Sequence, residues 1–335
     1  MTVRRRNVDM KPKQKRNRTG VYFFAVSLLC SVVSAFAQDP SPAAQQQNPS
    51  VRELHVIITD GKGHSVDDVQ QKDVQVIENG APQTIESFSL RELPIHYALM
   101  VDTSLSLRSQ FPAVIETAKG IVAANRTGDK AFIVRFVHSS RINIVQEKTS
   151  DKTQLLNALM LLRVEAGQTA LIDAIYATAE GLFQLARENR QAGKRTAIVL
   201  ITDGENRASS HTEDDLFKLL QKGDLRVFVI GLVKELDTEG GITRKSPREK
   251  ALNLIERLAK ETGGRAFFPN SKESFSGVIA DLVHNLQRQY VVEYRAQALA
   301  PGASYRVEVK VSDSPEKKKR RAILRPKYRA EELQQ

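Results

Sequence analysis

Apolar runs alternate with amphipathic stretches between about residues 94 and 290. The runs IHYALMVD (95–102), RTAIVLITD (195–203) and LRVFVIGL (225–232) are almost continuously apolar over the length of a strand. The segments between such runs carry apolar residues three and four positions apart, which is the period of a helix with one buried face. Strands without polar alternation are typical of a parallel sheet covered on both faces. This region therefore predicts an α/β fold: a doubly wound, mostly parallel sheet with helices on both faces.

The flanks of this region follow a period of two instead. Between residues 51 and 92, short runs alternate apolar and polar residues, and Asn79-Gly80 between two of them is a hairpin signal. We expect a small β module at 51–92, and C-terminal strands at 291–329 that could pair with it. Residues 38–50 are rich in Pro, Gln, Ser and Ala, which predicts a flexible linker.

The first 37 residues have the order of an export signal. A basic stretch precedes an apolar run, and Ala35 and Ala37 stand where signal peptidase needs small side chains. We expect cleavage after Ala37 and a periplasmic or secreted protein; an uncleaved membrane anchor is the alternative. The segment carries eight Lys or Arg and one Asp, so its removal lowers the net charge from +11 to about +4. It also holds the only cysteine, Cys30, which excludes thiolate chemistry in the mature chain.

Oxygen-bearing side chains gather in three segments of the α/β region. DTSLS (102–106) ends one predicted strand, GQTALIDA (167–174) opens a helix, and TDGEN (202–206) ends another strand. Ligands of an open α/β sheet bind at the carboxyl ends of its strands. Hydroxyl and carboxylate oxygens are the hard ligands that Mg²⁺ prefers. The candidate metal ligands are Asp102, Ser104, Ser106, Thr169 and Asp203.

The order of these motifs, D-x-S-x-S, then G-x-T-x-L-x-D-A, then T-D-G, resembles the metal-ion-dependent adhesion site (MIDAS) of von Willebrand factor A (VWFA) domains. The resemblance covers about residues 94–290 and implies the Rossmann-like fold of that family. The flanks are similar to those of acidobacterial VWFA-related proteins. The resemblance implies that a bound Mg²⁺, with Mn²⁺ or Ca²⁺ as alternatives, accepts a Glu or Asp from a partner protein. Leu105 departs from many relatives, which carry glycine or alanine there.

Each motif also has a plain structural interpretation. Asp102 and Ser104 could cap a helix, Thr169 could be an N-cap, and Asp203 could be a turn residue. The occurrence of all three motifs together, at strand ends predicted to be adjacent in one sheet, favours the metal site over these separate structural roles. Asp173 is expected to support the site or the helix dipole rather than to bind the ion.

Catalysis is the less favoured function. Ser104 stands where an aspartyl phosphatase would carry its second aspartate, and neither a G-x-S-x-G elbow nor a phosphate-binding loop occurs in the sequence. The predicted function is an exported adhesion module, without catalytic residues, that holds an acidic residue of a protein partner. The alternatives are an envelope scaffold whose metal site is structural or vestigial, and a metal-dependent hydrolase. The basic run at 315–329 indicates weak contact with anionic cell-surface polymers or the membrane surface rather than with nucleic acid.

Overall fold

The computed structural model describes residues 50–188, 195–241, 245–296, 299, 302–313 and 319–329. The predicted export signal and nearly all of the predicted linker lie outside these residues. Within the described part of the chain, no helix is long and apolar enough to cross a membrane.

The central sheet has six strands, in the order β6-β5-β4-β7-β8-β9. Its strands run parallel, except that β6 pairs antiparallel with β5 at one edge. Almost every side chain of β4 is buried, as expected for a strand covered on both faces. The strands are β4 (Ile95–Asp102), β5 (Lys130–Phe136), β6 (Ile142–Thr149), β7 (Arg195–Thr202), β8 (Leu225–Gly231) and β9 (Ala266–Phe267).

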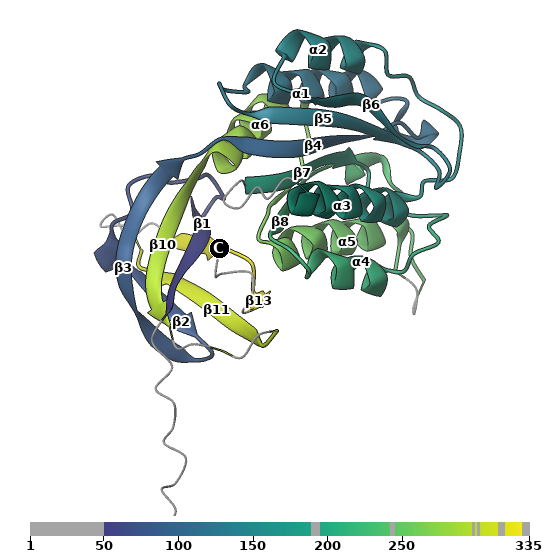
Figure 1. Cartoon of the computed structure of the whole chain (residues 1–335). Helices are drawn as coiled ribbons and strands as arrows, with labels where there is room; N and C mark the ends of the chain where they lie inside the picture. The colour runs from purple at the N-terminus through teal and green to yellow at the C-terminus, as the bar shows by residue number, and fades with distance from the viewer. Residues whose placement is uncertain are drawn as a thin grey trace, which may run out of the picture. The chain divides into compact units, whose positions relative to one another are not determined.

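Helices cover both faces of this sheet (Figure 1). Helices α1, α2 and α6 pack on one face, where they share a core with the odd-numbered residues of β4 such as Leu99. Helices α3, α4 and α5 pack on the other face, against even-numbered residues such as Met100. This confirms the doubly wound α/β architecture. The helices are α1 (Phe111–Ala123), α2 (Lys152–Met160), α3 (Leu171–Glu188), α4 (Glu213–Leu220), α5 (Pro247–Thr262) and α6 (Lys272–Gln287).

Strand β6 has no counterpart among the apolar runs from which the sheet was predicted. Its side chains are exposed or half-buried, and none is fully buried. An edge strand with few buried side chains lacks the continuous apolar run that marks the central strands. The hydrophobic pattern therefore gives little signal for it.

The flanking strands form a second, antiparallel sheet with the order β12-β1-β10-β3-β2-β11-β13. Strand β1 pairs with C-terminal strands on both sides, and β2 pairs with β3 and with β11. The β module is thus built from both flanks of the chain, as expected. The strands are β1 (Ser50–Asp60), β2 (Val74–Glu78), β3 (Ala81–Glu92), β10 (Arg288–Ala296), β11 (Ser304–Val311), β12 (Arg320–Ile323) and β13 (Lys327–Arg329).

Two short junctions connect the sheets. Strand β3 ends at Glu92 and β4 begins at Ile95, while α6 ends at Gln287 and β10 begins at the next residue, Arg288. Arg288 and Glu92 are register partners in the β3–β10 pair. The α/β domain is therefore inserted between two neighbouring strands of the second sheet.

A buried ion pair joins three strands of the second sheet. Arg52 of β1 donates from Nη1 to Glu78 Oε2 of β2 at 2.5 Å, and the Tyr294 hydroxyl of β10 donates to the same oxygen at 2.6 Å. Arg52 is 4%, Glu78 6% and Tyr294 0% exposed. A charge buried this deeply is tolerated only with its partner in place.

Replacing Arg52 with methionine is expected to lower the free energy of unfolding by about 3–5 kcal/mol, because the Glu78 carboxylate would stay buried without its cation. Denaturant unfolding measures the loss. The double variant Arg52→Met/Glu78→Gln should regain part of it, since the buried group is then neutral. A double variant no more stable than Arg52→Met would contradict this electrostatic explanation.

Candidate metal site

The first and third motifs meet at the carboxyl ends of β4 and β7, which are paired neighbours in the sheet. Asp102 is the last residue of β4, and Asp203 directly follows β7. After Asp102 the chain enters a 3₁₀ turn, η2 (Leu105–Leu107), which includes Ser106 and has Ser104 as its N-cap residue. The parallel pairing thus places the two aspartates at one edge of the sheet, where ligands of α/β folds bind.

Hydrogen bonds hold both oxygens of Asp102. The Ser104 N–H donates to Oδ1 at 2.9 Å, and the Thr202 hydroxyl donates to Oδ2 at 2.7 Å. The Gly204 N–H in turn donates to the Thr202 oxygen at 3.0 Å. This chain of bonds ties the end of β4 to the loop after β7. Thr202 was not predicted as a site residue, because its only signal in the sequence is its place in the T-D-G motif.

One carboxylate oxygen of Asp203 accepts a hydrogen bond, and the other has no partner among the described residues. The Glu205 N–H donates to Oδ1 at 2.9 Å. Oδ2 is buried and has no hydrogen-bond partner among the described residues. A buried carboxylate oxygen without a partner is costly unless something binds it. Gly204 permits this turn: its φ is +80°, and a Cβ there would lie 2.7 Å from Cδ1 of Ile255.

The electrostatics of the two aspartates favour a cation. Asp102 is 0% and Asp203 2% exposed. Burial and the charge of Asp203 together raise the pKa of Asp102 to about 7. Burial also raises the pKa of Asp203, although the nearby Ser106 hydroxyl and the hydrogen bond from the Glu205 N–H oppose this. A divalent cation would relieve both the burial cost and the repulsion, so these residues fit such an ion.

The hydroxyl groups complete the candidate ligand set. Ser104 Oγ and Ser106 Oγ lie 3.0 Å apart. Thr169 is 3% exposed, and its carbonyl accepts hydrogen bonds from the N–H groups of Arg207 and Ala208, at 2.8 and 3.1 Å. The second motif is therefore bound to the loop that starts at Asp203. The structure brings all three motifs together, and the ligand set itself stays a prediction.

The candidate site is buried at the two aspartates and exposed to solvent at the 3₁₀ turn η2. Ser104 is buried, whereas Ser106 is exposed and Leu105 is 44% exposed. Arg207 pairs with Glu205 at 2.7 Å near the same edge. No group of three or more His, Cys, Asp or Glu side chains suited to a metal occurs in the described ranges. The candidate site differs from such groups because it has two carboxylates and relies on hydroxyls for the rest.

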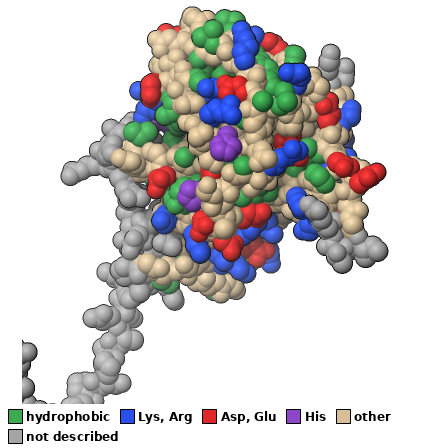
Figure 2. Space-filling view, turned by 90° about the vertical axis from the view of Figure 1, so that its right-hand side faces the viewer, with side chains coloured by type: hydrophobic (Ala, Val, Ile, Leu, Met, Phe, Trp, Pro, Cys, Tyr) green, Lys and Arg blue, Asp and Glu red, His purple; other side chains and the backbone are tan. Residues whose placement is uncertain are grey.

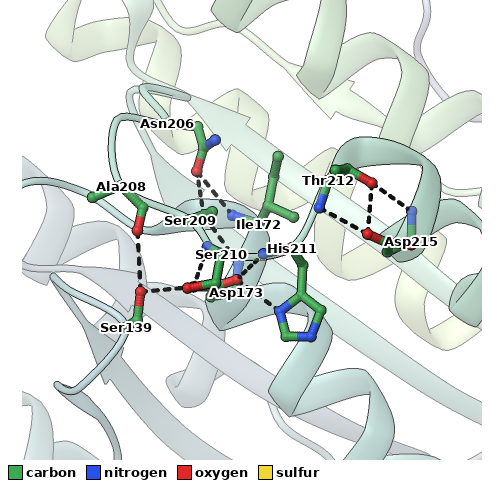
Figure 3. A network of polar contacts seen from close by, with 10 residues as sticks. All are labelled: Ser139, Ile172, Asp173, Asn206, Ala208, Ser209, Ser210, His211, Thr212 and Asp215. Atoms are coloured by element: carbon green, nitrogen blue, oxygen red, sulfur yellow. Dashed lines mark hydrogen bonds and ion pairs between the residues drawn. The ribbon is translucent and has the colours of Figure 1, made fainter.

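Asp173 holds the loop after β7 against the start of α3 (Figure 3). Its carboxylate accepts hydrogen bonds from the Ser139 hydroxyl at 2.6 Å and from the N–H groups of Ser210 and His211 at 2.8 and 2.9 Å. His211 Nδ1 lies 2.8 Å from the same carboxylate, and its ring stacks on Tyr176. These contacts give Asp173 a positioning role. Ser139 and His211 belong to no recognised motif, so their contacts with Asp173 were not predicted from the sequence.

These features define a class of α/β domains that carry carboxylate and hydroxyl side chains at the carboxyl ends of their parallel strands. The family model for the von Willebrand factor type A domain matches residues 98–284, more than half of the chain. The protein is therefore a member of the von Willebrand factor type A family, a family of protein-interaction domains that often depend on a metal.

Several solved structures resemble the chain, with TM-scores below 0.5, and these likenesses concern the fold alone. The conserved hypothetical protein BatB from Bacteroides thetaiotaomicron is 19% identical, with 57% of this chain and 98% of that chain covered and a TM-score of 0.43. A von Willebrand factor type A protein from Catenulispora acidiphila is 12% identical, with 86% and 74% covered and a TM-score of 0.45. Proximal thread matrix protein 1 from the mussel byssus, with a zinc-occupied MIDAS motif, is 18% identical, with 61% and 49% covered and a TM-score of 0.43. No curated protein sequence matches the chain.

Asp173→Asn is expected to lower the free energy of unfolding by about 2 kcal/mol at pH 7. Burial would raise the pKa of Asp173, but the hydrogen bonds from Ser139 and from the N–H groups of His211 and Ser210 outweigh it and hold the pKa at about 2. A carboxyl with a lowered folded-state pKa stabilises the fold above about pH 4, and this stability is lost as the pH falls toward 2. Denaturant unfolding of both proteins between pH 2 and 7 should show the difference shrinking below pH 4. A difference independent of pH would contradict the assignment.

Proposed function

We propose that the chain is an exported adhesion or protein-binding module that uses a divalent cation to hold a Glu or Asp side chain of a partner protein. The proposed ligands are Asp102, Ser104, Ser106, Thr169 and Asp203. The observation that carries the proposal is the pair of buried carboxylates, one with an unpartnered oxygen, beneath an exposed serine. Export rests on the sequence of residues 1–37 alone.

The chain's own residues prepare the site. The Ser104 N–H and the Thr202 hydroxyl fix the orientation of Asp102. Asp203 offers its free Oδ2 from the neighbouring strand end. Two carboxylates balance the charge of a divalent ion, and the hydroxyls add oxygens without further negative charge. When bound, Mg²⁺, or Mn²⁺ or Ca²⁺ in its place, supplies an electrophilic position that a partner carboxylate can occupy.

Binding rather than catalysis is proposed on the same contacts. Both oxygens of Asp102 are engaged in hydrogen bonds, which leaves that carboxylate poorly placed as a nucleophile. His211 is bonded through Nδ1 to Asp173 and stacked on Tyr176, so its ring is held in a structural contact. Neither group is arranged as a general base for a bound substrate.

A protein is the preferred partner class over an anionic polymer. Two arginines of the basic C-terminal run, Arg320 and Arg325, are 8% and 3% exposed. Arg320 pairs with Asp68 at 2.6 Å, and Arg325 donates to the Gly223 carbonyl at 2.8 Å. On the face in Figure 2, basic and acidic side chains lie interspersed with hydrophobic ones. A partner with local chemical complementarity suits this mixture better than a uniform polyanion.

Replacing Asp203 with asparagine is expected to have opposite effects with and without metal. Without metal it should raise the melting temperature, because a neutral amide removes the repulsion with Asp102. With millimolar Mg²⁺ or Mn²⁺, the wild-type chain should gain stability and Asp203→Asn should not. Thermal unfolding and calorimetric titration measure both effects, and Thr169→Ala should weaken metal binding at least about tenfold.

Ser109→Ala is the matched control for these variants. Ser109 is an exposed hydroxyl three residues beyond Ser106, and it donates to Glu235 rather than to the candidate site. This variant should bind metal as the wild type does. No stabilisation of the wild type by millimolar Mg²⁺ or Mn²⁺ would contradict the proposal and favour the scaffold alternative.

Partner capture should depend on the same residues. Proteins retained from an envelope extract by the wild-type chain in Mg²⁺ should be released by a chelator and lost with Thr169→Ala, but kept with Ser109→Ala. Changing the contacting Glu or Asp of a captured partner to Gln or Asn should abolish retention. Retention that survives both the chelator and Thr169→Ala would show that the chain binds its partners through another surface.

A further inference from the structure

A small cavity lined by several polar side chains lies at the opposite end of the central sheet from Asp102 and Asp203. It is lined by the first residues of β4 and β7, by Asp224 and the start of β8, and by His55 of β1 and Gln289 of β10. The cavity volume is about 10 Å³. That is enough for a single water or a small ion. The cavity is therefore enclosed between the amino ends of the parallel strands and the second sheet.

Two arginines line this cavity with donors that have no protein partner. Arg226 is 7% exposed; its Nη2 donates to the His55 carbonyl, whereas its Nη1 is buried and unpaired among the described residues. Arg195 donates from Nη2 to the carbonyls of Leu93 and Gln287, whereas its Nε and Nη1 are likewise buried and unpaired. Two cations that line one small cavity thus have three buried N–H-bearing atoms without partners among the described residues. Such groups are costly unless a ligand accepts their hydrogen bonds.

Nearby carboxylates do not satisfy these donors. Asp129 and Asp224 both favour the charge of Arg195. However, Asp129 Oδ1 accepts from the Ile95 N–H at 3.0 Å, and Oδ2 accepts from the Arg126 N–H at 2.8 Å. Asp224 is exposed, so water screens its charge. The two guanidiniums also repel each other: burial and the charge of Arg226 lower the pKa of Arg195 to about 10, which leaves it charged at neutral pH.

We propose that this cavity binds a small inorganic anion, of the size of chloride, between Arg195 and Arg226. An anion accepts hydrogen bonds from both guanidiniums and cancels part of their repulsion, which a neutral water cannot do. The cavity's size excludes large organic anions. His55 Nδ1 and Gln289 Oε1 also line it without partners, and the Gln289 oxygen, an acceptor, suits a water better than an anion. The experiment therefore has to separate the two occupants.

The proposed anion would act as a structural link between the sheets. Arg226 of β8 reaches the backbone of β1, and Arg195 of β7 reaches both junctions between the domain and the second sheet, at Leu93 and Gln287. A bound anion offsets part of the repulsion between the two arginines at this contact. The anion should therefore stabilise the folded chain in proportion to its occupancy.

Thermal unfolding of the full mature chain in sodium chloride and in sodium gluconate, at equal sodium concentrations, tests the proposal. The melting temperature should rise by a few degrees and saturate in chloride, but not in gluconate, which is too large for the cavity. Arg226→Met should lose the chloride-dependent rise. Arg295→Met should keep the chloride-dependent rise. Arg295 is exposed and paired with Glu86, so this control variant removes the same charge away from the cavity. Equal melting curves in the two salts, or a chloride effect retained in Arg226→Met, would overturn the proposal.

Crystals of the wild-type chain soaked in sodium bromide give a second readout that does not depend on a variant folding. An anomalous bromide peak between Arg195 and Arg226 is the expected result. Ordinary water density there, without an anomalous signal, would show that the cavity holds water and would overturn the proposal.

Discussion

The repulsion between the buried carboxylates of Asp102 and Asp203 is the constraint on which the candidate site depends. Parallel pairing of β4 with β7 brings the two strand ends together, and burial removes the water that would otherwise screen the charges. The fold holds Asp102 in place through Thr202 and the Ser104 N–H, and leaves Oδ2 of Asp203 without a partner. The arrangement makes physical sense if a cation offsets its cost.

The surrounding loops serve to keep this arrangement rigid. Asp173 gathers Ser139 and the backbone at Ser210 and His211, which fixes the loop after β7 against the start of α3. The loop also bonds back to the carbonyl of Thr169. At the other end of the same strands, N–H-bearing atoms of the Arg195 and Arg226 guanidinium groups are buried without partners among the described residues, and the buried carboxylate of Asp129 lies near Arg195. The carboxyl end of the sheet thus buries two aspartates, whereas the amino end holds two arginines with unpaired donors near the carboxylates of Asp129 and Asp224.

Hydrophobic pattern and motif order were sufficient for some parts of the molecule. The central strands are continuously apolar because both faces are covered, so β4, β7 and β8 are evident in the sequence. Asn79 and Gly80 have φ values of +49° and +86°, as the hairpin signal between β2 and β3 required. The five candidate ligands were found by motif, and the structure brings their segments together.

Other parts depend on contacts between residues far apart in the chain, which periodicity does not report. The pairing of β1 with β10 and β12 is of this kind, and so is the insertion of the α/β domain between β3 and β10. Edge strand β6 lacks the apolar run of its neighbours. Arg195 and Arg226 look in the sequence like the solvated first residues of strands, because their partners, the carbonyls of Leu93, Gln287 and His55, lie far from them in the chain.

The most direct test of the account is anomalous diffraction from crystals soaked in Mn²⁺. The account predicts one strong manganese peak at the carboxyl ends of β4 and β7, within coordination distance of an oxygen of Asp203 and of the Ser104 and Ser106 hydroxyls, and its loss in Asp203→Asn. A structure with millimolar Mn²⁺ present, the aspartates in the positions described, and no anomalous density between them would contradict it.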